Sequence, residues 1–273
     1  MPVTTNDDVT IWWAPEGPSD APAGDTPLLL IQGLGYTADM WHRVLPGLSG
    51  PRRTIRMDNR GVGRSSVPEP PWSIEDFVTD AINVLDDADV DRVHVFGASM
   101  GGLIAQELAI RHPDRVDRLV LGCTHPGGSD AVRMDPAAAT MLMDRTPKSA
   151  REAIEASIPF IYAAETSRDD IERDISARVR YALRATSYWG QLDAMRSHSG
   201  TLSRLADITA PTLVVHGTAD KLVQPGNAEL IAKAIPDARL EWLEGAGHVF
   251  WTDQPQRSVD VVNEFLAGGP IQV

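Results

Sequence analysis

Cysteine is almost absent from this sequence: Cys123 is the single one among 273 residues. One thiol cannot form an internal disulfide framework, nor a zinc site built from several cysteines. Basic residues are also few, since 25 Lys and Arg stand against 38 Asp and Glu, for a formal net charge of −13 at pH 7. Nucleic acids and anionic membrane surfaces both attract clustered cations, so this balance disfavours both as partners.

Long apolar runs are missing as well. No run approaches the ~20 residues of a transmembrane helix, and the acidic N-terminus lacks the apolar segment of a signal peptide. We therefore expect a cytoplasmic protein whose partner is a small molecule. The content of 42% hydrophobic and 23% charged residues is that of an ordinary globular protein, and the length fits one large domain or two small ones.

Short apolar or β-branched runs predict strands at residues 9–13, 28–32, 53–57, 92–96, 118–123, 213–216 and 239–243. The middle runs are almost continuously apolar, which is typical of strands buried on both faces of a parallel sheet. Helical patterns lie between them, notably at 73–87 and 100–111. This alternation predicts an α/β fold with a mostly parallel central sheet and helices on both faces.

Residues 124–200 interrupt the alternation. They show almost no strand pattern, and they predict helices at 135–144, 149–160 and 169–188. We expect an α/β core made of residues 1–123 and 201–273, with 124–200 as an inserted helical cap. The strands that flank the insertion should be neighbours in the sheet, which would place the cap over the carboxyl ends of the strands.

The strongest functional signal is Gly97-Ala98-Ser99-Met100-Gly101. This G-x-S-x-G pattern lies between a predicted strand and a predicted helix, as in a nucleophile elbow. In such a turn the residues two before and two after the serine approach closely, so only glycine-sized side chains fit. The pattern alone occurs by chance in about one chain in ten, and the strand and helix around it make it specific.

A nucleophilic serine needs a base, and the base needs an acid that orients it. In chains with this elbow the order is serine, acid, histidine. Only His248 follows the late strands, in a glycine-flanked loop, and Asp220 lies in a turn after the strand at 213–216. A plain turn aspartate is the alternative reading of Asp220. We predict that Ser99, Asp220 and His248 are catalytic.

The other six histidines are set aside as structural or too early in the chain. His94 is in the middle of a strand, His112 precedes a proline, and His198 is in the insertion. Three more lie near strand ends but before any plausible acid: His42, His125 and His216.

Together these motifs resemble the α/β-hydrolase superfamily in its serine-nucleophile branch, and most of all its enol-lactonase-like and methylesterase-like members with a helical cap. The resemblance covers nearly the whole chain. It rests on the elbow at Ser99 and on Gln32-Gly33-Leu34-Gly35, the segment 58–65, Gly217-Thr218-Ala219-Asp220 and Gly245-Ala246-Gly247-His248. One departure is Gln32-Gly33, where many members have His-Gly.

The resemblance implies an oxyanion hole made by the backbone N–H groups of Leu34 and Met100. The segment 58–65 is interpreted as structural, with a glycine turn that Asp58 and Arg60 hold by hydrogen bonds. Aromatic residues near these motifs are candidates for the substrate pocket or for ordinary packing: Tyr36, Trp41, Trp189, Phe250 and Trp251.

Several alternatives remain open. Gly33 to Ala38 matches G-x-G-x-x-A after a strand, with Asp58 about 20 residues further on, as in dinucleotide-binding proteins. That interpretation leaves Ser99, Asp220 and His248 unexplained. A non-catalytic receptor on the same frame is a second alternative. Carbon–carbon bond hydrolysis and cofactor-free perhydrolysis would use the same triad, whereas haloalkane dehalogenation uses an aspartate where this chain has Ser99.

The sequence therefore predicts a serine hydrolase that cleaves an ester or lactone of a small to medium apolar substrate. No metal and no organic cofactor is implied.

Overall fold

The computed structural model describes residues 2–6, 8–18, 26–146 and 148–268. Its centre is an eight-stranded sheet in the order β1-β2-β4-β3-β5-β6-β7-β8. The strands from β3 to β8 pair in parallel, and β1 and β2 are antiparallel at one edge. The strands are β1 (Val3–Asn6), β2 (Val9–Glu16), β3 (Leu28–Ile31), β4 (Thr54–Met57), β5 (Val93–Ala98), β6 (Val116–Gly122), β7 (Thr212–Gly217) and β8 (Ala238–Leu243).

The seven predicted strands are all present, and the predicted α/β class is confirmed. The prediction missed β1, because its four residues Val-Thr-Thr-Asn form no apolar run. The strands β6 and β7, which flank the insertion, are sheet neighbours as expected.

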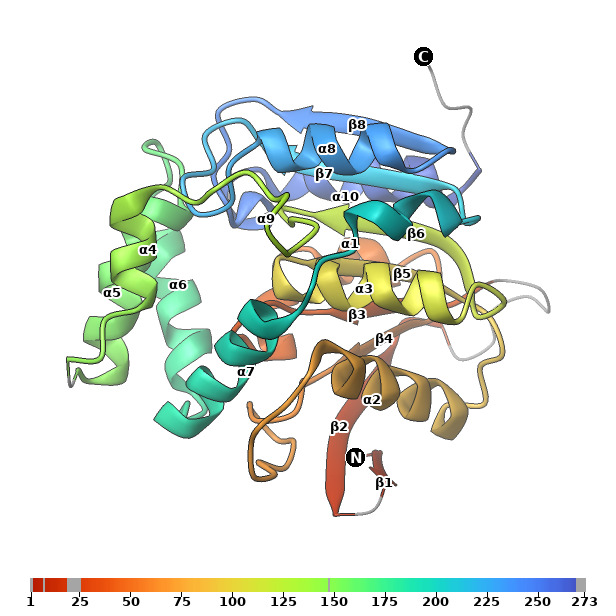
Figure 1. Ribbon diagram of the computed structural model, residues 1–273, viewed down its shortest axis with the longest axis horizontal. Helices are drawn as coiled ribbons and strands as arrows, with labels where there is room; N and C mark the ends of the chain where they lie inside the picture. Colours follow the sequence, from red (N-terminus) through yellow and green to blue (C-terminus); the bar gives the residue numbers. More distant parts are fainter. Residues whose placement is uncertain (1, 7, 19–25, 147, 269–273) are drawn as a thin grey trace.

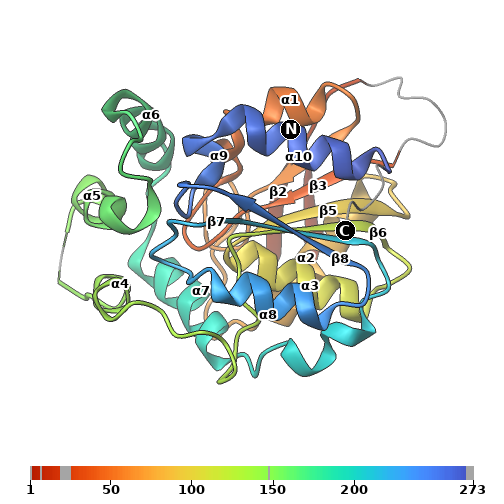
Figure 2. The same cartoon turned by 90° about the horizontal axis from the view of Figure 1, so that it is seen from above.

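Helices cover both faces of the sheet. Figure 2 shows α1 (Leu45–Ser49) and α10 (Pro255–Leu266) on one face, and α2 (Ile74–Asp87), α3 (Met100–Arg111) and α8 (Gly226–Ala234) on the other. Strand β3 explains the continuous apolar pattern: Leu29 and Ile31 pack in the core under α2 and α3, while Leu28 and Leu30 pack in the core under α10. All four side chains are fully buried.

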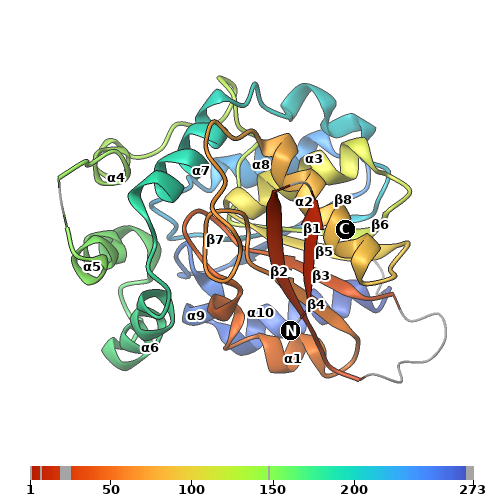
Figure 3. The same ribbon diagram turned by 90° about the horizontal axis from the view of Figure 1, so that it is seen from below.

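Among the described residues between β6 and β7, four α-helices gather at one end of the sheet (Figures 1 and 3). They are α4 (Pro136–Leu142), α5 (Ala150–Ile161), α6 (Arg168–Val179) and α7 (Ala185–Ser197). Short 3-10 helices, η1 (Ala38–Trp41) and η2 (Leu202–Asp207), and the one-turn helix α9 (Phe250–Asp253) complete the described elements. None of the described helices has the length and apolar content needed to cross a lipid bilayer.

The single helix predicted at 169–188 is wrong, because the chain breaks it after Val179 and resumes at Ala185. Tertiary contacts cause the break. The ring of Tyr181 lies against the Arg64 guanidinium, with its centroid 4.9 Å from the guanidinium carbon. Leu183 approaches the loop after β3 so closely that a Cβ at Gly35 would be 2.9 Å from its side chain.

The buried carboxylate of Asp58 joins the segment at the start of η1 to the loop after β4. Its Oδ1 accepts from the N–H of Ala38 at 2.8 Å and from Arg64 Nη2 at 2.9 Å. Its Oδ2 accepts from the Arg64 backbone N–H at 2.9 Å and from Nε at 2.6 Å. A Cβ at Gly63, where φ is +59°, would be 2.2 Å from this oxygen. Arg60 is anchored separately, on Asp80 of α2. The segment 58–65 is thus the hydrogen-bonded turn that the sequence predicts.

We expect Asp58→Asn to lower the free energy of unfolding by about 3 kcal/mol, since it removes a buried charge from its guanidinium partner and turns an amide NH₂ toward N–H donors. Urea denaturation measures the change. Glu172→Gln is the control: it weakens exposed pairs with Arg151 and Arg168 and should cost less than about 1 kcal/mol. Equal losses in the two variants would contradict the role given to Asp58.

Candidate active site

Ser99 lies in the turn between β5 and α3, with φ +56° and ψ −120°. Residues other than glycine rarely adopt this backbone region. A Cβ at Gly97 would be 2.2 Å from the carbonyl oxygen of Gly101, and a Cβ at Gly101 would be 2.2 Å from the carbonyl oxygen of Ile31. The two glycines are therefore required for the turn that exposes Ser99.

The structure brings His248 and Asp220 together from different loops. His248 Nδ1 lies 2.8 Å from Asp220 Oδ2, and both side chains are buried. The other oxygen of Asp220 accepts from the N–H groups of Leu222 and Val223, at 2.8 and 2.9 Å. The loops after β7 and β8 can approach because position 217 is a glycine: a Cβ there would be 2.3 Å from the Ala246 carbonyl oxygen.

A second imidazole, which the sequence reasoning set aside, also contacts the carboxylate. His216 Nε2 lies 3.1 Å from Asp220 Oδ2 and 2.9 Å from the carbonyl oxygen of Val223. Both partners accept, so this nitrogen carries the proton. Burial raises the pKa of Asp220, but His248 and His216 outweigh burial and lower it to about 2. The carboxylate is therefore ionised. In the sequence, the signal for this contact was that His216 lies four residues before Asp220.

His125 was also set aside, and it lines the same cavity as Ser99 and His248. Its Nδ1 accepts from the N–H of Gly127 at 3.0 Å, so its proton is on Nε2 when the ring is neutral. Burial, helped by the neighbouring His248, lowers the pKa of His125 to about 4. Its position just after β6 was the sequence signal for a place at this edge of the sheet.

The loop after β3 lies directly against Ser99, because a Cβ at Gly33 would be 2.9 Å from the Ser99 Cβ. In the described part of the chain, the backbone N–H groups of Leu34 and Met100 donate to no protein acceptor. Gln32 folds back on its own loop, where its Oε1 accepts from the Gly33 N–H at 3.2 Å. Its buried Nε2 has no partner among the described residues.

A cavity of about 1040 Å³ opens over Ser99 and His248. Three of the predicted pocket residues line it: Tyr36, Trp189 and Trp251. The prediction was wrong for Trp41 and Phe250, which are fully buried behind the cavity wall. Trp41 packs between Phe96 and Trp251, with ring centroids 4.9 and 5.3 Å away. Phe250 packs against Trp251 on the other side, at 5.2 Å.

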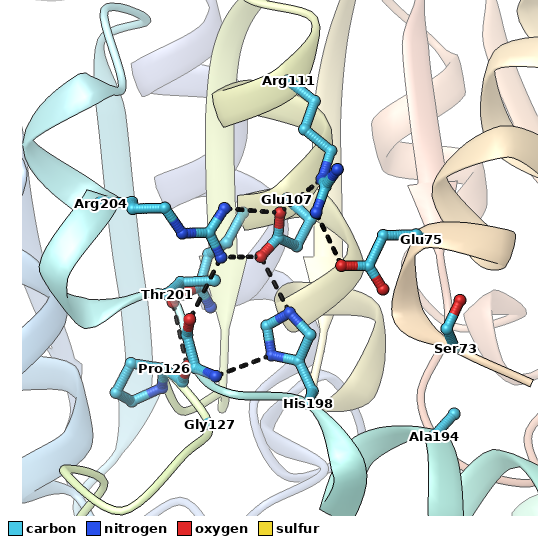
Figure 4. A network of polar contacts seen from close by, with 12 residues as sticks. Ser73, Glu75, Glu107, Arg111, Pro126, Gly127, Ala194, His198, Thr201 and Arg204 are labelled. Atoms are coloured by element: carbon cyan, nitrogen blue, oxygen red, sulfur yellow. Dashed lines mark hydrogen bonds and ion pairs between the residues drawn. The ribbon is translucent and has the colours of Figure 1, made fainter.

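Beside the cavity, the carboxylate of Glu107 on α3 joins the end of the helical segment to the core (Figure 4). It accepts from His198 Nε2 at 2.9 Å, from Arg111 Nε at 2.8 Å and from Arg204. Burial alone would raise the pKa of Glu107, but these bonds lower it well below its usual range. Glu75, Glu107 and His198 have oxygens and a nitrogen close enough to hold a metal ion. Two guanidinium groups already occupy Glu107, so the cluster fits a structural joint and not a cation site.

Comparison with known proteins identifies the class. A family model described as the alpha/beta hydrolase fold matches residues 26–254. The chain therefore belongs to the alpha/beta hydrolase fold family.

Individual relatives extend over most of the chain. It is 31% identical to RutD of Azorhizobium caulinodans, a proposed carbamate hydrolase, over 89% of this chain and 90% of that protein. It is 30% identical to a poly(3-hydroxyalkanoate) depolymerase of Ectopseudomonas oleovorans, over 88% and 84%. The crystal structure of the enol-lactonase from Burkholderia xenovorans LB400 is similar with a TM-score of 0.85 at 25% identity, over 97% and 100%.

We expect stability to fall as the pH drops from about 6.5 to about 4. Burial lowers the pKa of His94 to about 4, although Asp117 opposes the shift, and the pKa of His125 is also about 4. Unfolding restores both to about 6.5, so in this window the unfolded chain binds more protons. Urea denaturation of a His94→Asn, His125→Asn double variant at pH 7 and 4.5 should show a smaller loss than the wild type. At pH 8 both rings are neutral in the folded and the unfolded state, so the free energy of unfolding of each protein at this pH is the reference for its own loss. An equal loss of stability in the wild type and the double variant at pH 4.5 would rule out these histidines as the cause of the pH dependence.

Proposed function

We propose that this protein is a serine hydrolase that cleaves a carboxylic ester or lactone of a small molecule. The observation that carries the proposal is the His248–Asp220 hydrogen bond in the wall of a cavity that also exposes Ser99 at a left-handed turn. The fold alone would not identify the reaction, because one fold can host many functions.

The roles follow from the hydrogen bonds. Ionised Asp220 can only accept, so His248 carries a proton on Nδ1 and presents the lone pair of Nε2. Nε2 takes the proton of Ser99 as its Oγ attacks the carbonyl carbon, and returns it to the leaving alkoxide. The acyl-enzyme is then hydrolysed by water, which His248 deprotonates in the same way. No step needs a metal or an organic cofactor.

The unpaired N–H groups of Leu34 and Met100 are the donors for the oxyanion. Both belong to backbone segments that other contacts hold, so they require no reorganisation as negative charge develops on the carbonyl oxygen. A donor of this kind contributes roughly 3–4 kcal/mol to stabilising the transition state.

The relatives favour acyl transfer to water. A lactone is a cyclic ester and a poly(3-hydroxyalkanoate) is a polyester, so the names of two relatives specify ester bonds. RutD is named for a carbamate, whose carbonyl is attacked in the same manner. A panel of p-nitrophenyl esters, methyl esters, lactones and carbamates tests the proposal. Turnover of esters or lactones is expected, and turnover of carbamates alone would overturn it.

Ser99→Ala should lower kcat/KM for the best ester by about 10⁴-fold or more and should abolish labelling by a fluorophosphonate, since the attacking oxygen is lost. Mass spectrometry of the labelled protein locates the site. Ser129→Ala is the matched control, because this serine also lines the cavity. The variant should keep both ester hydrolysis and labelling by the fluorophosphonate. Labelling at another residue would refute the assignment of Ser99.

We further propose that residues 124–200 act as a cap that selects the substrate. Trp189→Ala on α7 should shift the preferred acyl-chain length, because it removes an aromatic wall of the cavity. The rate of fluorophosphonate labelling at Ser99 should change little. Phe160→Ala is the control, since Phe160 is a partly buried aromatic residue of α5 that does not line the cavity. An unchanged ranking of esters in the Trp189 variant would contradict selection by the cap.

A further inference from the structure

The charge of the cavity wall is opposite to the charge of the chain. Acidic residues outnumber Lys and Arg by 38 to 25 in the sequence. Among the residues that the structure describes, the cavity wall has one acidic residue, Asp144, and six basic ones: Arg133, Arg145, Lys148, Arg178, Arg184 and Arg196. Lys148 pairs with Asp144, and Arg196 lies 3.9 Å from Asp193. Among the described residues the other four arginines pair with no carboxylate.

Arg178, in the last turn of α6, is less exposed than the other arginines that line the cavity. Its side chain is partly buried, and its guanidinium carbon lies 4.5 Å from the centroid of the Tyr36 ring. Its one hydrogen bond to a described residue is a long one, 3.4 Å from Nη1 to Ser157 Oγ. A guanidinium has five N–H donors, so most of those of Arg178 have no acceptor among the described residues.

The nearest acid on the same helix does not neutralise it. Asp174 lies one turn earlier, and its oxygens are already used by other donors. Oδ1 accepts from Arg43 Nε at 3.1 Å, and Oδ2 accepts from the hydroxyls of Tyr162 and Thr252, at 3.1 and 2.7 Å. Taking a cation partly out of water without a partner is costly. A ligand that supplies the missing anion would offset that cost.

Arg178 is also well placed relative to the reacting groups. Tyr36 stands between the two: its ring contacts Arg178, and its backbone N–H donates to the Gly33 carbonyl oxygen at 3.2 Å. Gly33 in turn lies against Ser99. Arg178 and Ser99 also line the same cavity, so one small molecule can present its carbonyl to Ser99 and a second group to Arg178.

We infer that the substrate is an ester or lactone that carries a carboxylate, and that Arg178 binds this carboxylate through paired N–H donors. The inference rests on the proposed function for the bond that is cleaved. It replaces the apolar substrate expected from the sequence with an anionic one. Arginine suits this role because its planar fork matches both carboxylate oxygens.

Binding to the full-length Ser99→Ala variant tests the charge separately from turnover. Calorimetry would compare the mono-4-nitrophenyl ester of glutaric acid with 4-nitrophenyl pentanoate, a neutral ester of the same chain length. We expect tighter binding of the acid. Arg178→Met, added to Ser99→Ala, should reduce the preference for the acid about 10- to 100-fold, as expected for loss of a charged hydrogen-bonded pair. Arg178→Lys should restore part of it.

Arg173→Met is the control, because it removes the same charge from the same helix at an exposed position outside the cavity. It should leave the preference unchanged. Equal binding of the two esters, or an equal loss of preference in the Arg173 variant, would overturn the inference.

Turnover by the protein with Ser99 intact separates the two proposals. Hydrolysis of both esters without a preference governed by Arg178 would refute the carboxylate and leave the hydrolase standing. Selective binding of the acid without hydrolysis of any ester would refute the hydrolase and leave the anion site standing.

Discussion

The left-handed backbone at Ser99 is the constraint on which the rest of the site depends. Strain of this kind costs on the order of 1–3 kcal/mol and persists only where surrounding structure holds it. Here α3 presses against the end of β3, since a side chain at Gly101 would collide with the Ile31 carbonyl. From the other side, the hydroxyl of Thr124 donates to the Ser99 carbonyl oxygen at 2.7 Å. The end of β3 and the segment after β6 thus hold the turn at Ser99.

Hydrogen bonds give His248 and His125, two of the imidazoles that line the cavity, opposite characters. Asp220 fixes the proton of His248 on Nδ1, which leaves Nε2 as an acceptor. The Gly127 N–H occupies Nδ1 of His125, which leaves Nε2 of the neutral ring as a donor. A base therefore stands near a neutral donor, and neither tautomer depends on a substrate. His216 adds a further donor to Asp220, so the charge of that carboxylate is spread over several buried N–H groups.

Sequence reasoning identified what depends on local spacing. The glycines around Ser99, the apolar strands and the chain order of Asp220 and His248 are all visible within short windows. Packing decided the rest. Trp41 and Phe250 follow the motifs as closely as Trp251 does, yet they face the core. The break between α6 and α7 depends on contacts of residues 181 and 183 with distant loops. His125 precedes the acid in the chain, so the order of the catalytic residues excluded it as the base, and only its position after β6 indicated that it lies at this edge of the sheet.

The hydrogen bonds of Glu107 attach the helical insertion, which has charged residues in the cavity wall, to the helix that follows Ser99. His198 follows α7 directly, and its bond to Glu107 fastens that end of the insertion to α3, the helix that begins after Ser99. The buried carboxylate of Glu107 thus fixes the end of α7 relative to α3 and to the turn at Ser99. A chain with a net charge of −13 repels anions at long range. Attraction then has to act at short range, inside the cavity, where the low dielectric strengthens it and salt screens it little. Arg178 on α6, which is partly buried in the cavity wall, meets that requirement.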